Sequence, residues 1–243
     1  MGRIFKGAAV LCLAALSGLQ PAAGDLEFQP QDADKDAYTS INLARVGQLS
    51  VRIGVLTENS ELVEKIKSAL PSAQSDPPST TCEEAIAELK KTNFLAQLTE
   101  TGDQKYRQAV EKVLEAGFNE LQSYPEDEGE WTTFWGKPDF ANLARLLSSN
   151  STKVGCAVGT CTKTEEARTG TSITFLLCEM DPAAVQNKAP FDKEYYEALK
   201  ERKTSLTEMT DEDLKAPVQG GAAAAVPSLL VAGLTAIVVF ASA

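Results

Sequence analysis

The chain has 243 residues, a formal net charge of −11 at pH 7 and no histidine. The length suits one domain of ordinary size with a hydrophobic core, and the acidic balance disfavours nucleic acid as a partner. Without histidine, Ser-His and Cys-His nucleophile pairs are excluded. A carboxylate pair for glycoside hydrolysis is compatible with the composition, but no motif indicates one, and no P-loop or dinucleotide fingerprint occurs. The sequence therefore predicts a protein that is not an enzyme and takes no cofactor.

Residues 1–24 have the pattern of a signal peptide. Arg3 and Lys6 precede an apolar run from Ala8 to Leu16, and small residues occupy Ala22-Ala23-Gly24. This apolar run is too short to span a bilayer, so we expect cleavage rather than an uncleaved anchor. The mature chain is expected to begin at Asp25.

Helical periodicity of apolar residues marks the first half of the mature chain. The expected helices are Ala37–Leu49, Leu62–Leu70 after a cap at Asn59 or Ser60, a helix that begins at Thr81, and Gln104–Leu121. Val51, Ile53 and Val55 alternate, which fits either a short strand or a helix extension. Pro77-Pro78 predicts a surface loop over Ser72–Thr80.

The helix that begins at Thr81 has a capping box, because Glu84 follows three residues later. This start places Cys82, Ile86 and Leu89 on one face, so Cys82 is expected to point into the core. The apolar stripe of the Gln104–Leu121 helix is interpreted as core.

An acidic turn over Pro125–Glu130 precedes three aromatic residues, Trp131, Phe134 and Trp135. These aromatic side chains suit either a binding patch or packing beneath a loop. We favour packing, because large apolar side chains are normally buried.

Two segments later in the chain have the pattern of neighbouring antiparallel strands. Residues Lys153–Thr160 alternate, with the small residues Gly155, Ala157 and Gly159 on one face, so another layer can approach closely there. Residues Ser172–Met180 are β-branched and apolar, and end at an Asp-Pro pair.

The carboxyl-terminal region has the pattern of a glycosylphosphatidylinositol (GPI) signal. A polar helix after Pro182 is followed by an expected flexible stalk over 203–220 and an apolar run over Val226–Ala243 with no basic residue after Lys215. Gly220, Gly221 and Ala222 supply small residues for attachment, which we place at Gly220 or Gly221. Residues 221–243 would then be removed. The alternative is a genuine membrane helix at the carboxyl terminus, which normally carries basic residues on its cytoplasmic side.

Asn150-Ser151-Thr152 is the one glycosylation sequon of the chain. It lies just before the first of the two predicted strands, so Asn150 is expected on an exposed loop.

Four cysteines remain once the signal peptide and its Cys12 are removed: Cys82, Cys156, Cys161 and Cys178. An even number in an exported chain implies two disulfides. A zinc site is the competing interpretation, but no CxxC spacing and no histidine support it. Cys156 and Cys161 are an odd number of residues apart, so on one extended strand they face opposite sides and need different partners.

The segment from Ala141 to Cys156 resembles the region through the Gly-Cys motif of the CAP superfamily, which includes plant pathogenesis-related and venom cysteine-rich secretory proteins. The plan of the whole chain resembles the GPI-anchored SAG-type surface antigens of Eimeria and related coccidian parasites. The resemblance implies an α/β (α+β) fold, a CAP-like αβα sandwich over residues 25–202 with a small antiparallel sheet between helical layers. It also places Asn142 where CAP proteins carry a metal-site histidine, so no metal site is expected.

The resemblance further implies a GPI-anchored parasite surface antigen on the outer leaflet of the plasma membrane. Its expected partners are host-cell surface or immune proteins, and its expected role is host attachment or immune interaction. The first alternative is a lipid or sterol carrier, which a cavity lined by the Gln104–Leu121 helix would favour. The second is a structural surface-coat protein without a specific partner.

The disulfide pairing has two alternatives. Cys156 and Cys178 lie in the two strands expected to be neighbours, which leaves Cys82 for Cys161, and venom-type CAP proteins resemble this pattern. The competing pairing joins Cys82 to Cys156 and Cys161 to Cys178, which closes the end of the hairpin. We favour the first pairing.

Overall fold

The computed structural model describes residues 26–70, 81–99, 104–163 and 172–215. The predicted signal peptide, the loop over 72–80 and both proposed attachment glycines lie outside these residues. In chain order the elements are β1 (Leu26–Asp32), α1 (Lys35–Val46), β2 (Thr57–Glu58), α2 (Ser60–Ala69), α3 (Cys82–Lys90), β3 (Phe94–Leu98), α4 (Lys105–Glu120), α5 (Glu130–Trp135), α6 (Pro138–Leu147), β4 (Lys153–Lys163), β5 (Ser172–Asp181), α7 (Lys193–Glu201) and the short 3-10 helices η2 (Leu206–Glu208) and η3 (Asp211–Leu214).

The predicted helix starts are set by side-chain caps. Asp34 accepts hydrogen bonds from the main-chain N–H groups at the start of α1, and Asn59 does the same for α2. The Thr81 hydroxyl accepts from Glu84 N at 3.2 Å, so α3 begins where the sequence predicts. Residues 51–55 form neither a strand nor an extension of α1.

The strands form one sheet in the order β1-β4-β5-β3, in which β2 adds to β4 in parallel. Strands β4 and β5 pair antiparallel, as predicted, and their register sets Cys156 opposite Cys178. Strand β3 pairs only with β5 among the described strands, so it forms one edge of the sheet.

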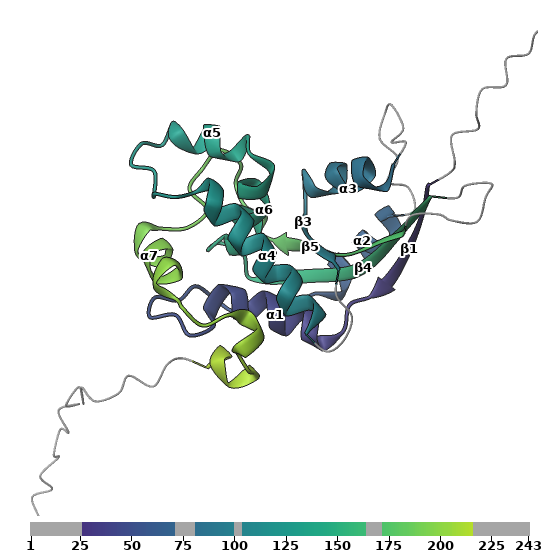
Figure 1. Ribbon diagram of the computed structural model, residues 1–243, viewed down its shortest axis with the longest axis horizontal. Helices are drawn as coiled ribbons and strands as arrows, with labels where there is room; N and C mark the ends of the chain where they lie inside the picture. Colours follow the sequence, from purple (N-terminus) through teal and green to yellow (C-terminus); the bar gives the residue numbers. More distant parts are fainter. Residues whose placement is uncertain (1–25, 71–80, 100–103, 164–171, 216–243) are drawn as a thin grey trace, which may run out of the picture.

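Helices cover both faces of the sheet, and each face has its own hydrophobic core. Helices α1, α4, α5, α6 and α7 share one core with Val154, Cys156 and Val158 of β4. Helices α2 and α3 share the other core with Phe175 and Leu177 of β5. Figure 1 shows α1 and α3 on opposite sides of the sheet. This arrangement is the αβα sandwich that the resemblance implies.

The small-residue face of β4 allows α2 to approach the sheet closely. A Cβ atom at Gly155 would lie 2.4 Å from Leu62 Cβ and 2.6 Å from the main-chain N of Val63. Only a residue without a side chain fits under α2 at this point, because real Cβ atoms do not approach other atoms so closely.

Two disulfides connect these layers. Cys156–Cys178 has an S–S distance of 2.08 Å and joins the paired strands β4 and β5. Cys82–Cys161 has an S–S distance of 2.11 Å and joins the start of α3 to β4. The structure therefore has the first of the two pairings considered. Cys156 lies in one core and Cys161 in the other, as their odd separation predicts.

The aromatic residues after the acidic turn pack inside the protein, as favoured from the sequence. Trp131 and Trp135 of α5 are buried and surround Phe140 of α6 with ring centroids 5.9 Å away in both cases. Trp135 also donates its indole N–H to the carbonyl of Lys188 at 2.8 Å. This cluster attaches the α5 segment to the main core.

The stalk predicted over 203–220 is wrong for its first part. Leu206 and Met209 are each 1% exposed and belong to the core beside α1 and α4. Arg107 of α4 donates to the Met209 carbonyl, and Arg202 donates to the Leu43 and Ala44 carbonyls at the end of α1. Few apolar residues occur in this segment, but Leu206 and Met209 are buried and α4 supplies a donor for its main chain. The folded domain therefore extends beyond residue 202, as far as Lys215.

Candidate functional site

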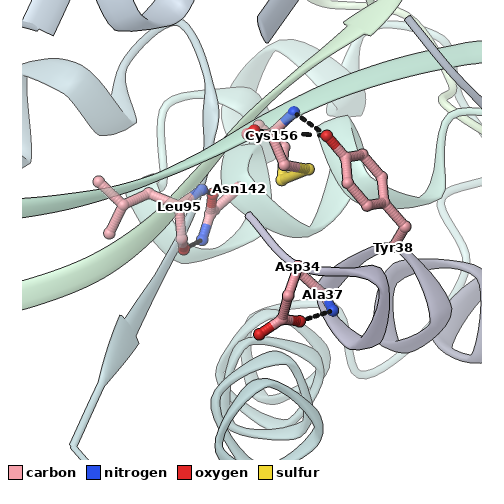
Figure 2. The surroundings of a disulfide bond; sticks show 7 residues. Asp34, Ala37, Tyr38, Leu95, Asn142 and Cys156 are labelled. Atoms are coloured by element: carbon pink, nitrogen blue, oxygen red, sulfur yellow. Dashed lines mark hydrogen bonds between the residues drawn. A yellow bond between two sulfur atoms is a disulfide. The ribbon is translucent and has the colours of Figure 1, made fainter. Parts of the chain in front are cut away.

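Asn142 of α6 occupies the position where the resemblance would place a metal-binding histidine. Its side chain is buried, and Figure 2 shows its amide against the main chain of Leu95. Oδ1 accepts from Leu95 N at 2.9 Å, and Nδ2 donates to the Leu95 carbonyl at 2.8 Å. The amide thus makes the two hydrogen bonds to Leu95 that a residue of a neighbouring strand would make. A neutral group already engaged at both of its ends has no ligand role to offer a metal.

A groove with a volume of about 440 Å³ lies beside β3, and we call it the β3 groove. Helix α3 supplies one wall, α4 and α6 supply the other, and β3 lies between them (Figure 1). The lining residues are Glu83, Ile86, Ala87, Lys90, Leu95, Gln97, Thr99, Ala109, Lys112, Val113, Ala116, Asp139, Asn142 and Ile173. This volume is within the range of small-ligand and peptide sites in proteins.

The charged residues of the β3 groove are arranged as ion pairs and hydrogen bonds rather than as a catalytic centre. Lys90 Nζ lies 2.6 Å from Asp139 Oδ1, and Lys112 Nζ donates to Thr99 Oγ1 at 2.8 Å. Within the described ranges, no group of three or more cysteine, aspartate or glutamate side chains is placed to hold a metal ion.

A smaller groove of about 270 Å³ lies between α2 and the end of β5. Arg145 of α6 borders it and donates to the carbonyls of Lys90 and Lys91. The guanidinium also lies 5.7 Å from the centre of the Trp135 ring. Burial lowers the pKa of Arg145 below its ordinary value, but its donors are already used to hold the end of α3, which is a structural role.

The turn that carries Asn150 is held from beneath by Arg45 of α1. This guanidinium is fully buried and donates to the carbonyls of Leu146, Ser148 and Ser151, the first at 2.6 Å and the others at 3.0 and 3.3 Å. Burial lowers the pKa of Arg45 to about 10. The turn is therefore fixed by one buried cation, while Asn150 itself points outward and is exposed. Arg45 was not predicted as a functional residue, because nothing in the sequence distinguishes it from other charged residues of a helix.

The predicted site residues thus have different outcomes. The four cysteines form the two disulfides, Asn150 is exposed, and Gly220 and Gly221 lie outside the described residues. No helix in the described part of the chain is long and apolar enough to cross a membrane. The amide of Asn142 and the edge of β3 beside it were not predicted as parts of a site.

Solved structures that are similar to this chain include one from Eimeria tenella and one called NaASP2. The crystal structure of the surface antigen protein SAG19 of Eimeria tenella has a TM-score of 0.49 and 21% sequence identity, and the alignment covers 70% of this chain and 96% of that one. NaASP2, crystallised with Zn²⁺, has a TM-score of 0.36 and 14% identity, and the alignment covers 65% of this chain and 82% of that one. No curated protein matches the sequence.

The model of the sporozoite surface antigen (SAG) protein domain matches residues 8–217, which is most of the chain and includes every described element. The chain belongs to the sporozoite surface antigen (SAG) family.

Proposed function

We propose that this protein is a GPI-anchored surface antigen that does not act as an enzyme and that contacts host cells or immune proteins through its folded domain. The observation that carries the proposal is the family match over residues 8–217 in a chain whose two ends have the patterns of a signal peptide and a GPI signal. Surface antigens of this family are cell-surface proteins. The lipid anchor and the contact with a host are the proposed parts.

The proposed anchor would hold the domain close to the membrane. The folded domain reaches Lys215, and the four residues 216–219 separate it from Gly220. At about 3.3–3.6 Å per residue, the five steps from Lys215 to Gly220 span at most roughly 18 Å. The proposed anchor would thus lie close to the folded domain, so a partner would meet the domain near the membrane surface.

The proposal of a non-enzymatic role is supported by the residues of the β3 groove. Its aspartate is paired with a lysine, its buried amide is used by the sheet, and the chain has no histidine to act as a general base.

Asn150 is proposed as a glycosylation site, because it is exposed on a turn that Arg45 fixes in place. Digestion of the secreted protein with peptide-N-glycosidase should lower its mass and convert Asn150 to aspartate. An Asn150→Gln variant with an unchanged mass before digestion would show that the site is not used.

The alternative function, a lipid or sterol carrier, can be judged from the lining of the β3 groove. The groove is lined in part by α4, as that alternative requires. Apolar side chains make up half of the lining residues, but Glu83, Lys90, Lys112 and Asp139 carry charge, whereas sites for apolar ligands are lined mainly by apolar side chains. The role of a surface antigen is therefore supported better than that of a lipid or sterol carrier.

Attachment is tested by binding of the fluorescent, disulfide-bonded ectodomain (residues 25–220) to host epithelial cells. Saturable binding that an excess of unlabelled ectodomain displaces is the expected result. The control is ectodomain that has been reduced and alkylated, which should not compete. Binding that never saturates, or that the reduced control displaces equally, would show that no specific host contact is made.

A further inference from the structure

Among the described residues, none pairs with the outer edge of β3 at Gln97, on the floor of the β3 groove. Successive residues of an antiparallel strand direct their main-chain groups to opposite edges. Leu95 directs its N–H and C=O away from β5, because Asn142 binds both of them. Gln97 lies two residues further along the same strand, so its N–H and C=O face the same outer edge. Neither group has a side-chain or loop partner among the described residues.

The walls of the groove restrict what can reach this edge. Ile86 and Ala87 of α3 stand on one side of β3, and Val113 and Ala116 of α4 stand on the other. An added strand lies about 4.8 Å from its neighbour, whereas packed layers lie about 10 Å apart. A sheet that carries its own helices would therefore collide with α3 and α4. A single extended chain fits between them.

Lys90 of α3 and Asp139 of α6 are paired with each other, and the charges outside this pair differ in sign between the two walls. Glu83 is exposed on α3, and Lys112 on α4 lies over the edge with its ammonium on Thr99 Oγ1. Side chains of an extended peptide alternate between its two faces. A peptide with a basic residue next to an acidic one can direct the first towards α3 and the second towards α4.

We propose that the β3 groove binds an extended peptide segment of a partner protein, which adds a strand to β3 through the main chain of Gln97. The site depends on neither the lipid anchor nor attachment to host cells, and it goes beyond both. Asn142 marks one end of it, because its amide already occupies the position opposite Leu95. The added strand is short and runs along residues 97–99.

An apolar ligand fits this groove less well than a peptide does. A hydrocarbon over the floor would bury the N–H and C=O of Gln97 without hydrogen bonds, which costs free energy. A peptide main chain satisfies both groups. The unpaired edge therefore selects a polypeptide rather than a lipid.

The test begins with a displayed library of random decapeptides selected on the disulfide-bonded ectodomain, residues 25–220. Enriched peptides are synthesised and their affinities are measured by isothermal titration calorimetry on three proteins: the wild type, Gln97→Pro and Gln97→Thr. Proline removes the outward N–H and leaves the β3–β5 hydrogen bonds intact, since an edge strand tolerates proline at such a position. Threonine changes the side chain and keeps the N–H, so Gln97→Thr is the matched control.

The expected result is equal binding by the wild type and Gln97→Thr, with at least a tenfold loss of affinity in Gln97→Pro, about the value of one hydrogen bond. The amide of Gln97 should exchange rapidly in the free protein and slowly in the complex, while that of Ala96, which faces β5, is slow in both. N-methylation of alternate peptide residues should abolish binding, and N-methylation of the intervening residues should not. If Gln97→Pro does not fold, binding of the N-methylated peptides to the wild type is sufficient to test the proposal.

Three results would overturn the proposal. One is the absence of any enriched peptide. Another is a set of peptides that bind Gln97→Pro as tightly as the wild type and tolerate N-methylation at every position. The third is displacement of the peptides by cis-parinaric acid, together with equal affinity of this fatty acid for the wild type and Gln97→Pro. That result would make the groove a site for apolar small molecules.

Discussion

The hydroxyl of Tyr38 on α1 takes both outward main-chain hydrogen bonds of Cys156 on β4 (Figure 2). It accepts from Cys156 N at 3.3 Å and donates to the Cys156 carbonyl at 3.4 Å. Pairing with β1 reaches only as far as Ala157, and pairing with β2 ends at Val154. Cys156 therefore lies in a gap between two strands, and the tyrosine hydroxyl completes the edge of β4.

Replacing Tyr38 by phenylalanine is expected to lower the free energy of unfolding by about 1–3 kcal/mol, because two buried main-chain groups lose their partner. Urea unfolding measures the change. Tyr196→Phe is the control, since the Tyr196 hydroxyl serves one acceptor, the Leu121 carbonyl at 3.2 Å, and its loss should cost less. A Tyr38→Phe variant as stable as the wild type would show that the gap at Cys156 does not depend on this hydroxyl.

The parts of this fold that depend on local pattern could be predicted from the sequence. The caps at Asn59 and Thr81, the β4–β5 pair and the opposed faces of Cys156 and Cys161 all follow from spacing within a few residues. The CAP-like arrangement of layers came from a resemblance, because spacing does not specify which helix covers which face.

The parts that depend on contacts between distant residues could not be predicted. Tyr38 binds main-chain groups 118 residues away, and Arg45 binds carbonyls more than 100 residues away. Leu206 and Met209 lie in a mostly polar segment that looks like a stalk, and only the surface between α1 and α4 makes them core residues. Likewise, Gln97 becomes a candidate binding residue only because β3 is an edge strand.

Gly155 is expected to tolerate no side chain. Gly155→Ala places a methyl group 2.4 Å from Leu62 Cβ, so α2 must move away from the sheet, and we expect a loss of about 1–3 kcal/mol in the free energy of unfolding. Gly54→Ala is the matched control, because a Cβ there meets nothing within 4 Å. Thermal unfolding of both variants tests the difference. Equal melting temperatures would contradict the close approach of α2.

Met209 is expected to contribute to stability, although it lies in the segment first interpreted as a stalk. Its sulfur packs over Gly47 at the end of α1, and Met209→Ala should cost about 2–5 kcal/mol. Glu212→Ala, in the same segment but exposed, should stay within about 0.5 kcal/mol of the wild type. If both variants unfold like the wild type in guanidinium chloride, the segment is a stalk after all.

Asp36 should cause the free energy of unfolding to fall as the pH rises in the acidic range. Burial raises the pKa of its carboxyl above the ordinary value of 3.8, although the charge of Arg107 opposes the shift. Between the unfolded and folded pKa values the folded state binds more protons, so the free energy of unfolding falls as pH rises through this interval. Asp36→Asn should remove this component, which urea unfolding between about pH 3 and 6 can measure.

Asp213 should affect the pH dependence of the free energy of unfolding in the opposite direction. Hydrogen bonds from the Thr210 main chain and the Gln48 side chain lower the pKa of Asp213, so its contribution is lost as pH falls. Asp213→Asn should therefore remove a component of the opposite sign. The same sign of change in both variants would contradict these two assignments.

The most direct test of the account is release of the native protein from intact parasites by phosphatidylinositol-specific phospholipase C. An antibody to the folded domain should label the surface of unpermeabilised cells before digestion. After digestion the protein should appear in the supernatant, and mass spectrometry should show that it ends at Gly220 or Gly221 and carries the glycan remnant of the anchor on that residue. A protein that stays with the cells after complete digestion, with the 221–243 peptide still attached, would contradict lipid anchoring and show a membrane helix instead.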